Sequence, residues 1–204
     1  MKKNFNIIID VIIVIVIILL YVFSYMYLYN NFRERKRKEV TKQIIKKIDK
    51  VIKDIKEEKP NNEITEVEVT YNDIKFTVLG KLYIEKIGLY EPILKENNKA
   101  ALDTALVKAA GPDLNKNGNV VIAGHNYMKN AYFIKINRLV VGDKITVIDL
   151  SGNSVDYYVY ETSVIGMDDP SYLKQPTEPK EKIVTLVTCT NTGKERHIIK
   201  AKAW

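Results

Sequence analysis

The sequence predicts a mainly β domain, a closed β-barrel with one or two short helices, preceded by an N-terminal apolar helix and a basic amphipathic helix. Three observations lead to this prediction. Short β-branched and aliphatic runs recur from residue 64 onward, and Gly or Pro punctuates them. A single stretch within this region has helical spacing. Residues 7–29 are almost wholly apolar, and lysines and arginines crowd the segment that follows.

The apolar stretch predicts a helix that can cross a membrane. Residues 7–29 are interrupted only by Asp10 and Ser24. At about 1.5 Å per residue this stretch reaches ~34 Å, and a hydrocarbon core is about 30 Å thick. Tyrosines gather at its downstream end, as in an aromatic belt. Residues 1–32 are therefore expected to form a retained anchor. The alternative is a cleaved signal peptide, but no small-x-small cleavage site follows the apolar run.

The basic segment, residues 33–60, reads as an amphipathic helix and linker. Its apolar residues recur three or four positions apart, and lysines fill the other face; they are Val40, Ile44, Ile48, Val51 and Ile55. Two interpretations stay open. The apolar stripe packs against the following domain, or the basic side lies on anionic lipid headgroups or wall polymer.

The net charge of +7 lies almost entirely in this helix. Residues 33–59 hold 12 Lys and Arg against 6 Asp and Glu, whereas residues 60–204 are near neutral. A nucleic-acid-binding domain would carry its basic excess on the folded part, so this class of function is excluded.

The remaining residues, 61–204, are expected to form the β domain. Helical spacing continues from Asn98 to Ala110, and Gly111-Pro112 would end that helix. The segment 166–181 contains three prolines and is expected to be a loop. Patterns typical of strands cover 67–71, 75–84, 87–94, 119–124, 144–150, 154–165, 183–189 and 196–204.

Three chemically active side chains fall at the ends of predicted strands. Cys189, the only cysteine, ends the run 183–189. His125 follows a run that stops at Gly124, and Arg196 opens the last run. A thiol, an imidazole and a guanidinium are the nucleophile, proton carrier and oxyanion partner of a cysteine acyl-transfer enzyme. In isolation, Cys189 would instead be read as a small buried hydrophobe or an incidental thiol.

The second histidine, His197, is expected to be a bystander. Successive side chains of a strand point to opposite faces. If Arg196 points into the site, then its neighbour His197 points away from it, and His125 is left as the histidine partner of Cys189.

The motifs around these residues resemble the sortase family of Gram-positive bacteria. They are Thr-Leu-Val-Thr-Cys at 185–189 with Arg196 after it, Ala-Gly-His-Asn at 123–126, Leu-Tyr-Ile-Glu-Lys-Ile-Gly-Leu-Tyr-Glu-Pro-Ile at 82–93, and Ala-Gly-Pro at 110–112. The resemblance covers roughly 80–204 and implies a closed sortase-type β-barrel. The short connection between Cys189 and Arg196 is similar to class B members. The region before His125 is similar to classes A and D, so the subclass stays open.

The resemblance also implies roles for individual residues. Cys189 would attack a backbone carbonyl of a sorting peptide, His125 would act as general acid and then as base, and Arg196 would bind the oxyanion. The backbone N–H of Thr190 is a further candidate oxyanion donor. Residues expected to line the peptide groove are Thr185, Thr188, Thr190, Pro170, Tyr172 and Leu173. Glu91, Glu96 and Asp103 are scattered, so no metal and no cofactor is expected.

The implied activity is that of a membrane-anchored transpeptidase. It would cleave an LPxTG-like motif through a thioacyl intermediate and pass the protein to an amine of peptidoglycan or a pilin. The resemblance implies an extracellular catalytic domain, although the positive-inside rule applied to the basic flank 33–38 favours the opposite orientation. Two alternatives stay open, a cysteine peptidase with water as acceptor and a non-catalytic anchored binding domain.

Overall fold

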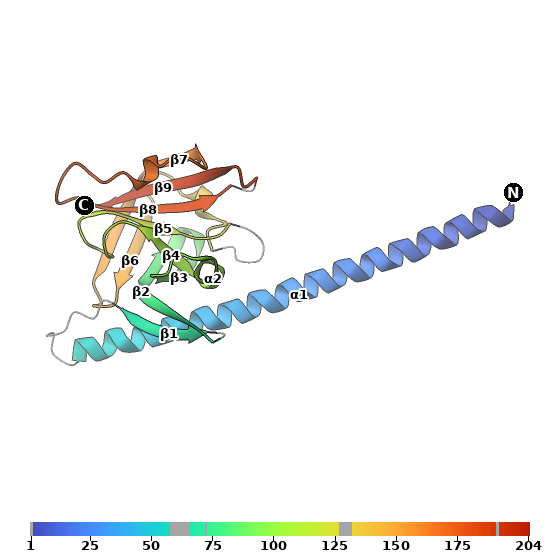
Figure 1. Cartoon of the computed structure of the whole chain (residues 1–204), viewed down its shortest axis with the longest axis horizontal. Helices are drawn as coiled ribbons and strands as arrows, with labels where there is room; N and C mark the ends of the chain where they lie inside the picture. The colour runs from blue at the N-terminus through green and yellow to red at the C-terminus, as the bar shows by residue number, and fades with distance from the viewer. Residues whose placement is uncertain (1, 58–65, 72, 127–131, 191) are drawn as a thin grey trace. The chain divides into compact units, whose positions relative to one another are not determined.

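The structure is a computed structural model that describes residues 2–57, 66–71, 73–126, 132–190 and 192–204. Its helices and strands, labelled in Figure 1, are α1 (Lys2–Glu57), α2 (Lys99–Thr104), β1 (Val67–Tyr71), β2 (Ile74–Ile84), β3 (Leu89–Leu94), β4 (Leu106–Ala110), β5 (Gly118–Ala123), β6 (Lys144–Asp149), β7 (Ser154–Gly166), β8 (Lys182–Cys189) and β9 (Glu195–Ala203). Three short 3-10 turns are η1 (Glu85–Ile87), η2 (Ile136–Arg138) and η3 (Ser171–Leu173).

The strands close into a barrel. Their order is β1-β2-β3-β4-β5-β8-β9-β7-β6, and β6 returns to pair with β2, so that β2 to β9 form a closed ring of eight. The β3–β4 and β5–β8 pairs are parallel and the others antiparallel, while β1 pairs with β2 at the rim. Closure leaves no free edge along the ring. The closed β-barrel predicted from the strand pattern is confirmed.

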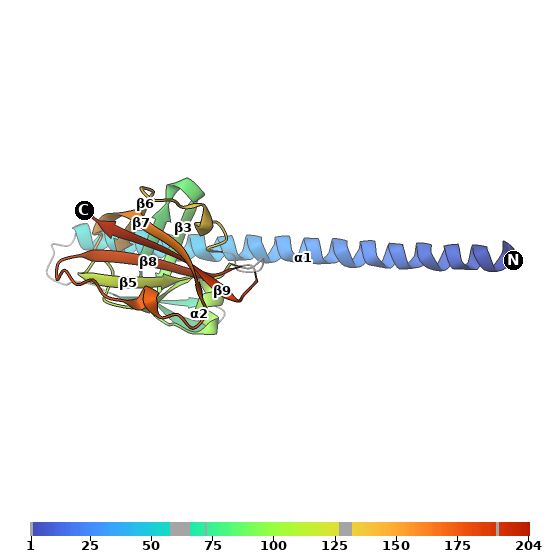
Figure 2. The ribbon, with the colours of Figure 1, turned by 90° about the horizontal axis from the view of Figure 1, so that it is seen from above.

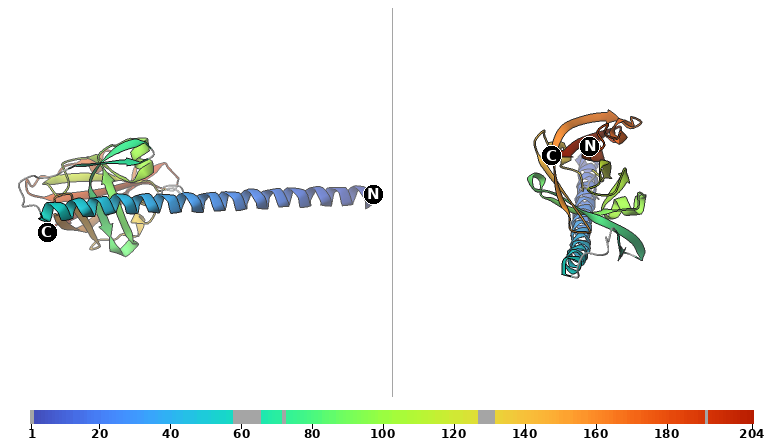
Figure 3. Two further views of the ribbon diagram at one scale, coloured as in Figure 1. Left: turned by 90° about the horizontal axis from the view of Figure 1, so that it is seen from below. Right: turned by 90° about the vertical axis from the view of Figure 1, so that its left-hand side faces the viewer.

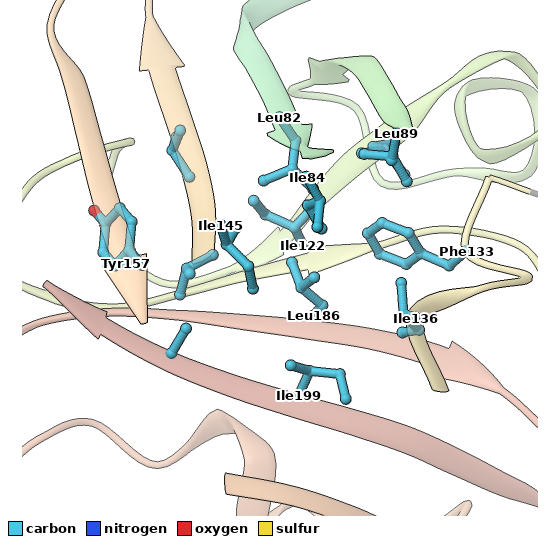
Figure 4. Packing of buried hydrophobic residues seen from close by; sticks show 14 of the residues in the cluster. Leu82, Ile84, Leu89, Ile122, Phe133, Ile136, Ile145, Tyr157, Leu186 and Ile199 are labelled. Carbon is cyan, nitrogen blue, oxygen red and sulfur yellow. The ribbon is translucent and has the colours of Figure 1, made fainter. Parts of the chain in front are cut away.

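The inside of the barrel is an apolar core to which most of the strands contribute. Figure 4 shows side chains from β2, β5, β6, β8 and β9 pointing toward one another. Alternate residues of each strand face this core and the intervening residues face outward. Fully buried members include Leu82, Ile84, Ile122, Ile145, Leu186 and Phe133. The alternation decides which face of the barrel each catalytic candidate occupies.

The chain divides into two compact units, one ending at Lys38 and one from Glu39 to Trp204, and α1 contributes to both. In the first unit every side chain from Val11 to Phe23 is exposed. This helix is long and apolar enough to cross a membrane, a criterion that an N-terminal signal sequence also meets.

In the second unit the end of α1 packs on the domain. Val40, Ile44 and Ile48 are buried with Phe76, Val78 and Leu94 in a second apolar cluster, and Figure 3 shows this cyan part of the helix running beside the strands. Lys81, 5% exposed, forms an ion pair with Asp49 of the helix. Lys42, Lys46 and Lys50 remain exposed. The structure therefore supports packing for this stretch, and its basic side stays open to solvent.

The helix predicted from Asn98 to Ala110 is wrong beyond Thr104. Ala105 is extended, with φ −160° and ψ −168°, and β4 begins at Leu106. Leu106 and Val107 pair in parallel with Ile93 and Leu94 of β3, and all four are fully buried. Tertiary pairing and burial thus outweigh the helix propensity of the alanines and leucines. The early stop leaves Asp103 at the end of α2.

Candidate active site

Strand register places the three candidate residues at one level on three neighbouring strands. Cys189 of β8 lies directly opposite Arg196 of β9. On the other side, Ala123 of β5 is level with Val187, and the Gly124 N–H donates to the Val187 carbonyl at 3.2 Å. The same register continued by two residues brings His125 level with Cys189. Strands β5, β8 and β9 lie side by side in Figure 2, and neighbouring strands are about 4.8 Å apart.

The three residues also share the outer face of the barrel. Alternate residues Val121, Val187 and Ile198 form a small apolar cluster outside the barrel, packed against Tyr172. Their neighbours Ile122, Leu186 and Ile199 belong to the interior core. His125, Cys189 and Arg196 have the parity of the outer cluster. His197 has the opposite parity and lies opposite Thr188. The register thus pairs Cys189 with Arg196 and gives His197 the opposite parity, and the contacts of Gly124 and Asn126 with the end of β8 bring the segment of His125 to the same place.

Cys189 is exposed at the end of its strand. Two contacts tie this end to the segment that carries His125. The Thr188 hydroxyl donates to the Gly124 carbonyl at 2.6 Å, and the Asn126 side-chain amide donates to the Cys189 carbonyl at 2.9 Å. The backbone beside the thiol is therefore held while the sulfur remains accessible to a peptide.

His125 is partly buried, and its side chain is 22% exposed. Its Nε2 lies 3.3 Å from Oδ1 of Asp103 at the end of α2. The second carboxylate oxygen of Asp103 accepts from Lys99 at 2.6 Å. Burial lowers the pKa of His125 from its ordinary value of 6.5, the Asp103 carboxylate opposes this, and Lys99 adds to the lowering. Burial thus disfavours the charged imidazolium of His125, and the Asp103 carboxylate favours it.

Arg196 is held by Tyr172 of η3. Its Nη1 donates to the Tyr172 hydroxyl at 2.7 Å, and its Cζ lies 5.3 Å from the centre of the tyrosine ring. The planar guanidinium can make both contacts at once and still present further N–H donors. The charge is therefore fixed beside Cys189.

The loop that carries Tyr172 is anchored by Asn119, which is 1% exposed. The Asn119 amide donates to the carbonyls of Tyr172 and Lys174, and its oxygen accepts from the Thr185 hydroxyl at 2.8 Å. Gln175 also bonds both main-chain groups of Asn119, at 2.8 and 3.2 Å. We call these residues, Asn119, Gln175 and Thr185, the loop clamp.

The predicted groove residues occupy different environments. Pro170 and Leu173 are exposed on the loop beside Tyr172. Thr185 and Thr188 are buried, and their hydroxyls bind Asn119 and Gly124. The N–H of Thr190 donates to the Glu195 carbonyl at 2.8 Å, so this geometry commits it to the turn and does not support its expected use as an oxyanion donor.

The sequence did not point to Asp103, Asn119 or Gln175 as parts of the site, and it placed Thr185 in the groove and not in the loop clamp. In the sequence, Asp103 was considered only as one of three scattered acidic residues, which were not expected to form a metal site. Its neighbour in space, His125, is 22 positions away in sequence, and only the fold brings them together. Among the described residues there is no group of three or more His, Cys, Asp or Glu side chains placed to hold a metal ion.

Known proteins resemble this chain in sequence and in fold. Residues 82–204 match the sortase domain family. Sortase A of Bacillus anthracis is 27% identical over 128 residues, which cover 61% of this chain and 59% of that relative's length. The shared region therefore spans less than two thirds of the relative.

Solved structures show the same fold. A Clostridium perfringens sortase D5 transpeptidase superposes with a TM-score of 0.60 and 29% identity, covering 82% of this chain and 98% of that one. Sortase C-1 of Actinomyces oris gives 0.57 and 25%, covering 62% and 73%. Sortase A of Corynebacterium diphtheriae gives 0.57 and 23%, covering 62% and 60%, which shows likeness of fold. The family match covers more than half of the chain, and we conclude that this chain belongs to the sortase family.

Proposed function

We propose that this protein is a membrane-anchored cysteine transpeptidase that cleaves an LPxTG-like sorting motif and transfers the protein to an amine of the cell wall or of a pilin. One observation carries the proposal. Exposed Cys189 lies opposite Arg196 in the β8–β9 register, and the side-chain amide of Asn126, next to His125, donates to the Cys189 carbonyl. This set supplies a nucleophile, a proton carrier and a fixed positive charge.

The first half of the reaction forms a thioester. The Cys189 sulfur, as thiolate, attacks the threonine carbonyl carbon of the motif, and the carbonyl oxygen becomes an oxyanion that Arg196 stabilises. Protonated His125 gives its proton to the glycine nitrogen as the C–N bond breaks. The products are a thioacyl-enzyme, a free amine and neutral His125.

The second half transfers the acyl group. The acceptor amine attacks the thioester carbon, and His125 takes the proton that the amine loses. The C–S bond then breaks, which restores the Cys189 thiolate and releases a new amide. An imidazole whose pKa lies near neutral pH can serve as acid in one half and as base in the other.

The exposed loop residues Pro170 and Leu173, with Tyr172, would form one wall of the peptide groove. Because Thr185 and Thr188 are buried, we propose that they hold the backbone around the site and do not contact the peptide. Thr185 does so through the loop clamp, and Thr188 through the segment before His125.

Transfer to an amine distinguishes this function from peptide hydrolysis. The full chain in detergent micelles is incubated with an LPxTG-containing peptide, with and without an oligoglycine or another primary amine. The proposal predicts an amide product that requires both the amine and Cys189, and Cys189→Ala as the control forms none. Free acid alone at saturating amine would instead identify a peptidase. If no sorting peptide is turned over and Cys189 is alkylated no faster than a model thiol, the protein would instead be a non-catalytic binding domain.

The apolar part of α1 would anchor the domain on the extracellular face. Since Cys189 is the only cysteine and is exposed, its labelling reports the side on which the domain lies. A membrane-impermeant maleimide added to intact cells is expected to label the wild type but not Cys189→Ala. If labelling needed prior permeabilisation of the cells, the domain would face the cytoplasm, as the basic flank 33–38 alone suggests.

A further inference from the structure

We propose that Asp103 is a positioning residue for His125, holding the imidazole with Nε2 toward α2 so that Nδ1 is left for proton transfer at Cys189. This inference rests on the proposed function of the site, since it assigns a second residue to the histidine that the function uses. It starts from one contact, the 3.3 Å between Oδ1 of Asp103 and Nε2 of His125.

The backbones of both residues are held by consecutive residues of one segment. The Tyr132 hydroxyl donates to the Asp103 carbonyl at 3.3 Å, and the Phe133 N–H donates to the His125 carbonyl at 2.9 Å. Tyr132 is 4% exposed and Phe133 is fully buried, both in the barrel core. The Asp103–His125 pair is therefore positioned by the core.

The short helix that carries Asp103 is itself fixed at its start. The Asn98 side chain accepts from the Ala101 N–H at 3.0 Å, which caps the helix. Ala101 is fully buried in the second apolar cluster. The Ala105 N–H then donates to the Ala101 carbonyl at 2.9 Å, just where the chain turns extended. Asp103 lies between these two fixed points.

The lack of a side chain at Gly124 allows the segment that carries His125 to pack closely against Leu106 and Phe133. A Cβ at this position would meet Leu106 Cδ2 at 2.6 Å and the Phe133 ring at 3.0 Å. The first is closer than real Cβ atoms approach, and both neighbours are fully buried. The residue before His125 thus packs against the beginning of β4, next to the end of α2.

The chemistry of the pair assigns the two ring nitrogens. An imidazole N–H facing a carboxylate is favoured over a lone pair facing it, so Nε2 carries the proton in the neutral ring. Nδ1 is then the nitrogen that accepts and returns a proton. Among the described residues, Asp103 and Lys99 of α2 are the charged groups that act on the ring, and the β8–β9 pair Cys189 and Arg196 lies at the neighbouring strand ends. Asp103 is the carboxylate among these groups, and it favours the imidazolium needed to protonate the leaving amine.

The alternative is that Asp103 serves only its ion pair with Lys99. The Lys99 side chain is 86% exposed, and exposed pairs within one helix contribute little to stability. The change in the pKa of His125 in two variants tests whether Asp103 acts on the histidine. Removing the Asp103 charge should lower the pKa of His125 further, because Asp103 opposes the effect of burial. Removing the Lys99 charge should raise it, because Lys99 disfavours the imidazolium.

The test is an NMR titration of the full chain in detergent micelles with labelled histidine. The chain has only His125 and His197, so His197→Gln assigns the two signals. We expect Asp103→Asn to lower the pKa of His125, Lys99→Gln to raise it, and His197 to stay unchanged in both. In turnover of a sorting peptide, Asp103→Asn should lower kcat/KM at least about tenfold, a part of the ~10²–10⁴ that general acid–base catalysis supplies. The pH profile of Lys99→Gln should move to higher pH.

Two results would overturn the proposal. One is a His125 titration that Asp103→Asn leaves unchanged, and the other is a shift of the same sign in both variants. The titration needs no activity, so it decides the role of Asp103 even if no sorting peptide is turned over. If Asp103→Asn does not fold, then Asp103→Ser carries the titration, and a His125 pKa that does not fall in that variant contradicts the proposal.

Discussion

At the scale of single residues, the alternation of side chains along each strand determines which residues can belong to the site. Cys189 and Arg196 lie opposite one another on β8 and β9, His125 follows the end of β5 by two residues, and one step along a strand turns a side chain to the other face of the barrel. His197 shows the difference, since it is adjacent to Arg196 but has the opposite parity. Function at this scale therefore depends on register as much as on residue type.

Arg196→Lys tests whether the guanidinium of this residue stabilises the oxyanion. Lysine keeps the charge but has no planar fork, so it cannot hold the Tyr172 hydroxyl and an oxyanion together. We expect kcat for a sorting peptide to fall by roughly 10²–10³, the usual cost of one oxyanion donor. His197→Gln is the matched control on the adjacent position and should change kcat little. A variant Arg196→Lys with wild-type kcat would remove Arg196 from the oxyanion site.

At the scale of elements, the loop between β7 and β8 is ordered by contacts from β5. The loop clamp holds the backbone carbonyls of Tyr172 and Lys174, and Tyr172 in turn holds Arg196. The position of the guanidinium thus depends on a buried amide two strands away, since β8 lies between β5 and β9.

Gln175→Ala is expected to loosen this loop without unfolding the barrel. The variant loses two hydrogen bonds to the main chain of Asn119, while Asn119 and Thr185 stay paired. Hydrogen exchange measured by mass spectrometry should speed up at 170–176 and remain unchanged in β8 and β9. Lys174→Ala is the control, because the clamp uses its backbone carbonyl and not its side chain. Equal exchange in all three proteins would show that the clamp does not order the loop.

The elements also show what sequence alone could and could not predict. Periods of two residues and Gly or Pro breaks locate the strands within a few positions, because alternation follows directly from barrel burial. The stretch after Ala105 misleads, because its apolar spacing fits a helix as well as a buried strand. Asp103 and Asn119 were missed because their partners, His125 and Tyr172, are distant in sequence and carry no local motif. Thr185 was expected in the groove, but its hydroxyl is buried against Asn119.

At the scale of the whole molecule, the domain begins before its first strand. The part of α1 from Glu39 onward belongs to the compact unit of the barrel, and Val40, Ile44 and Ile48 share a cluster with β1, β2 and β3. The basic side of this helix stays exposed. A catalytic fragment that starts at residue 60 would therefore uncover apolar surface of the domain.

Ile48→Ala tests whether the helix is part of the fold. Ile48 is fully buried, and removing a buried isoleucine side chain to Ala typically costs about 2–5 kcal/mol. Chemical denaturation in detergent micelles, followed by circular dichroism, should show this loss in the free energy of unfolding. Lys50→Ala, at an exposed position of the same helix, should stay within about 0.5 kcal/mol of the wild type. A cost for Ile48→Ala no larger than that of Lys50→Ala would mean that the barrel folds independently of α1.

The central claim is that Cys189 is the nucleophile, served by His125 and Arg196 on one face of the barrel. The most direct measurement is mass spectrometry of the full chain in micelles after brief incubation with an LPxTG-containing peptide and no amine. The account predicts an added mass equal to the peptide up to its threonine less one water, located on Cys189 and removed by hydroxylamine. An adduct elsewhere in the chain, or one that persists in Cys189→Ala, would contradict it.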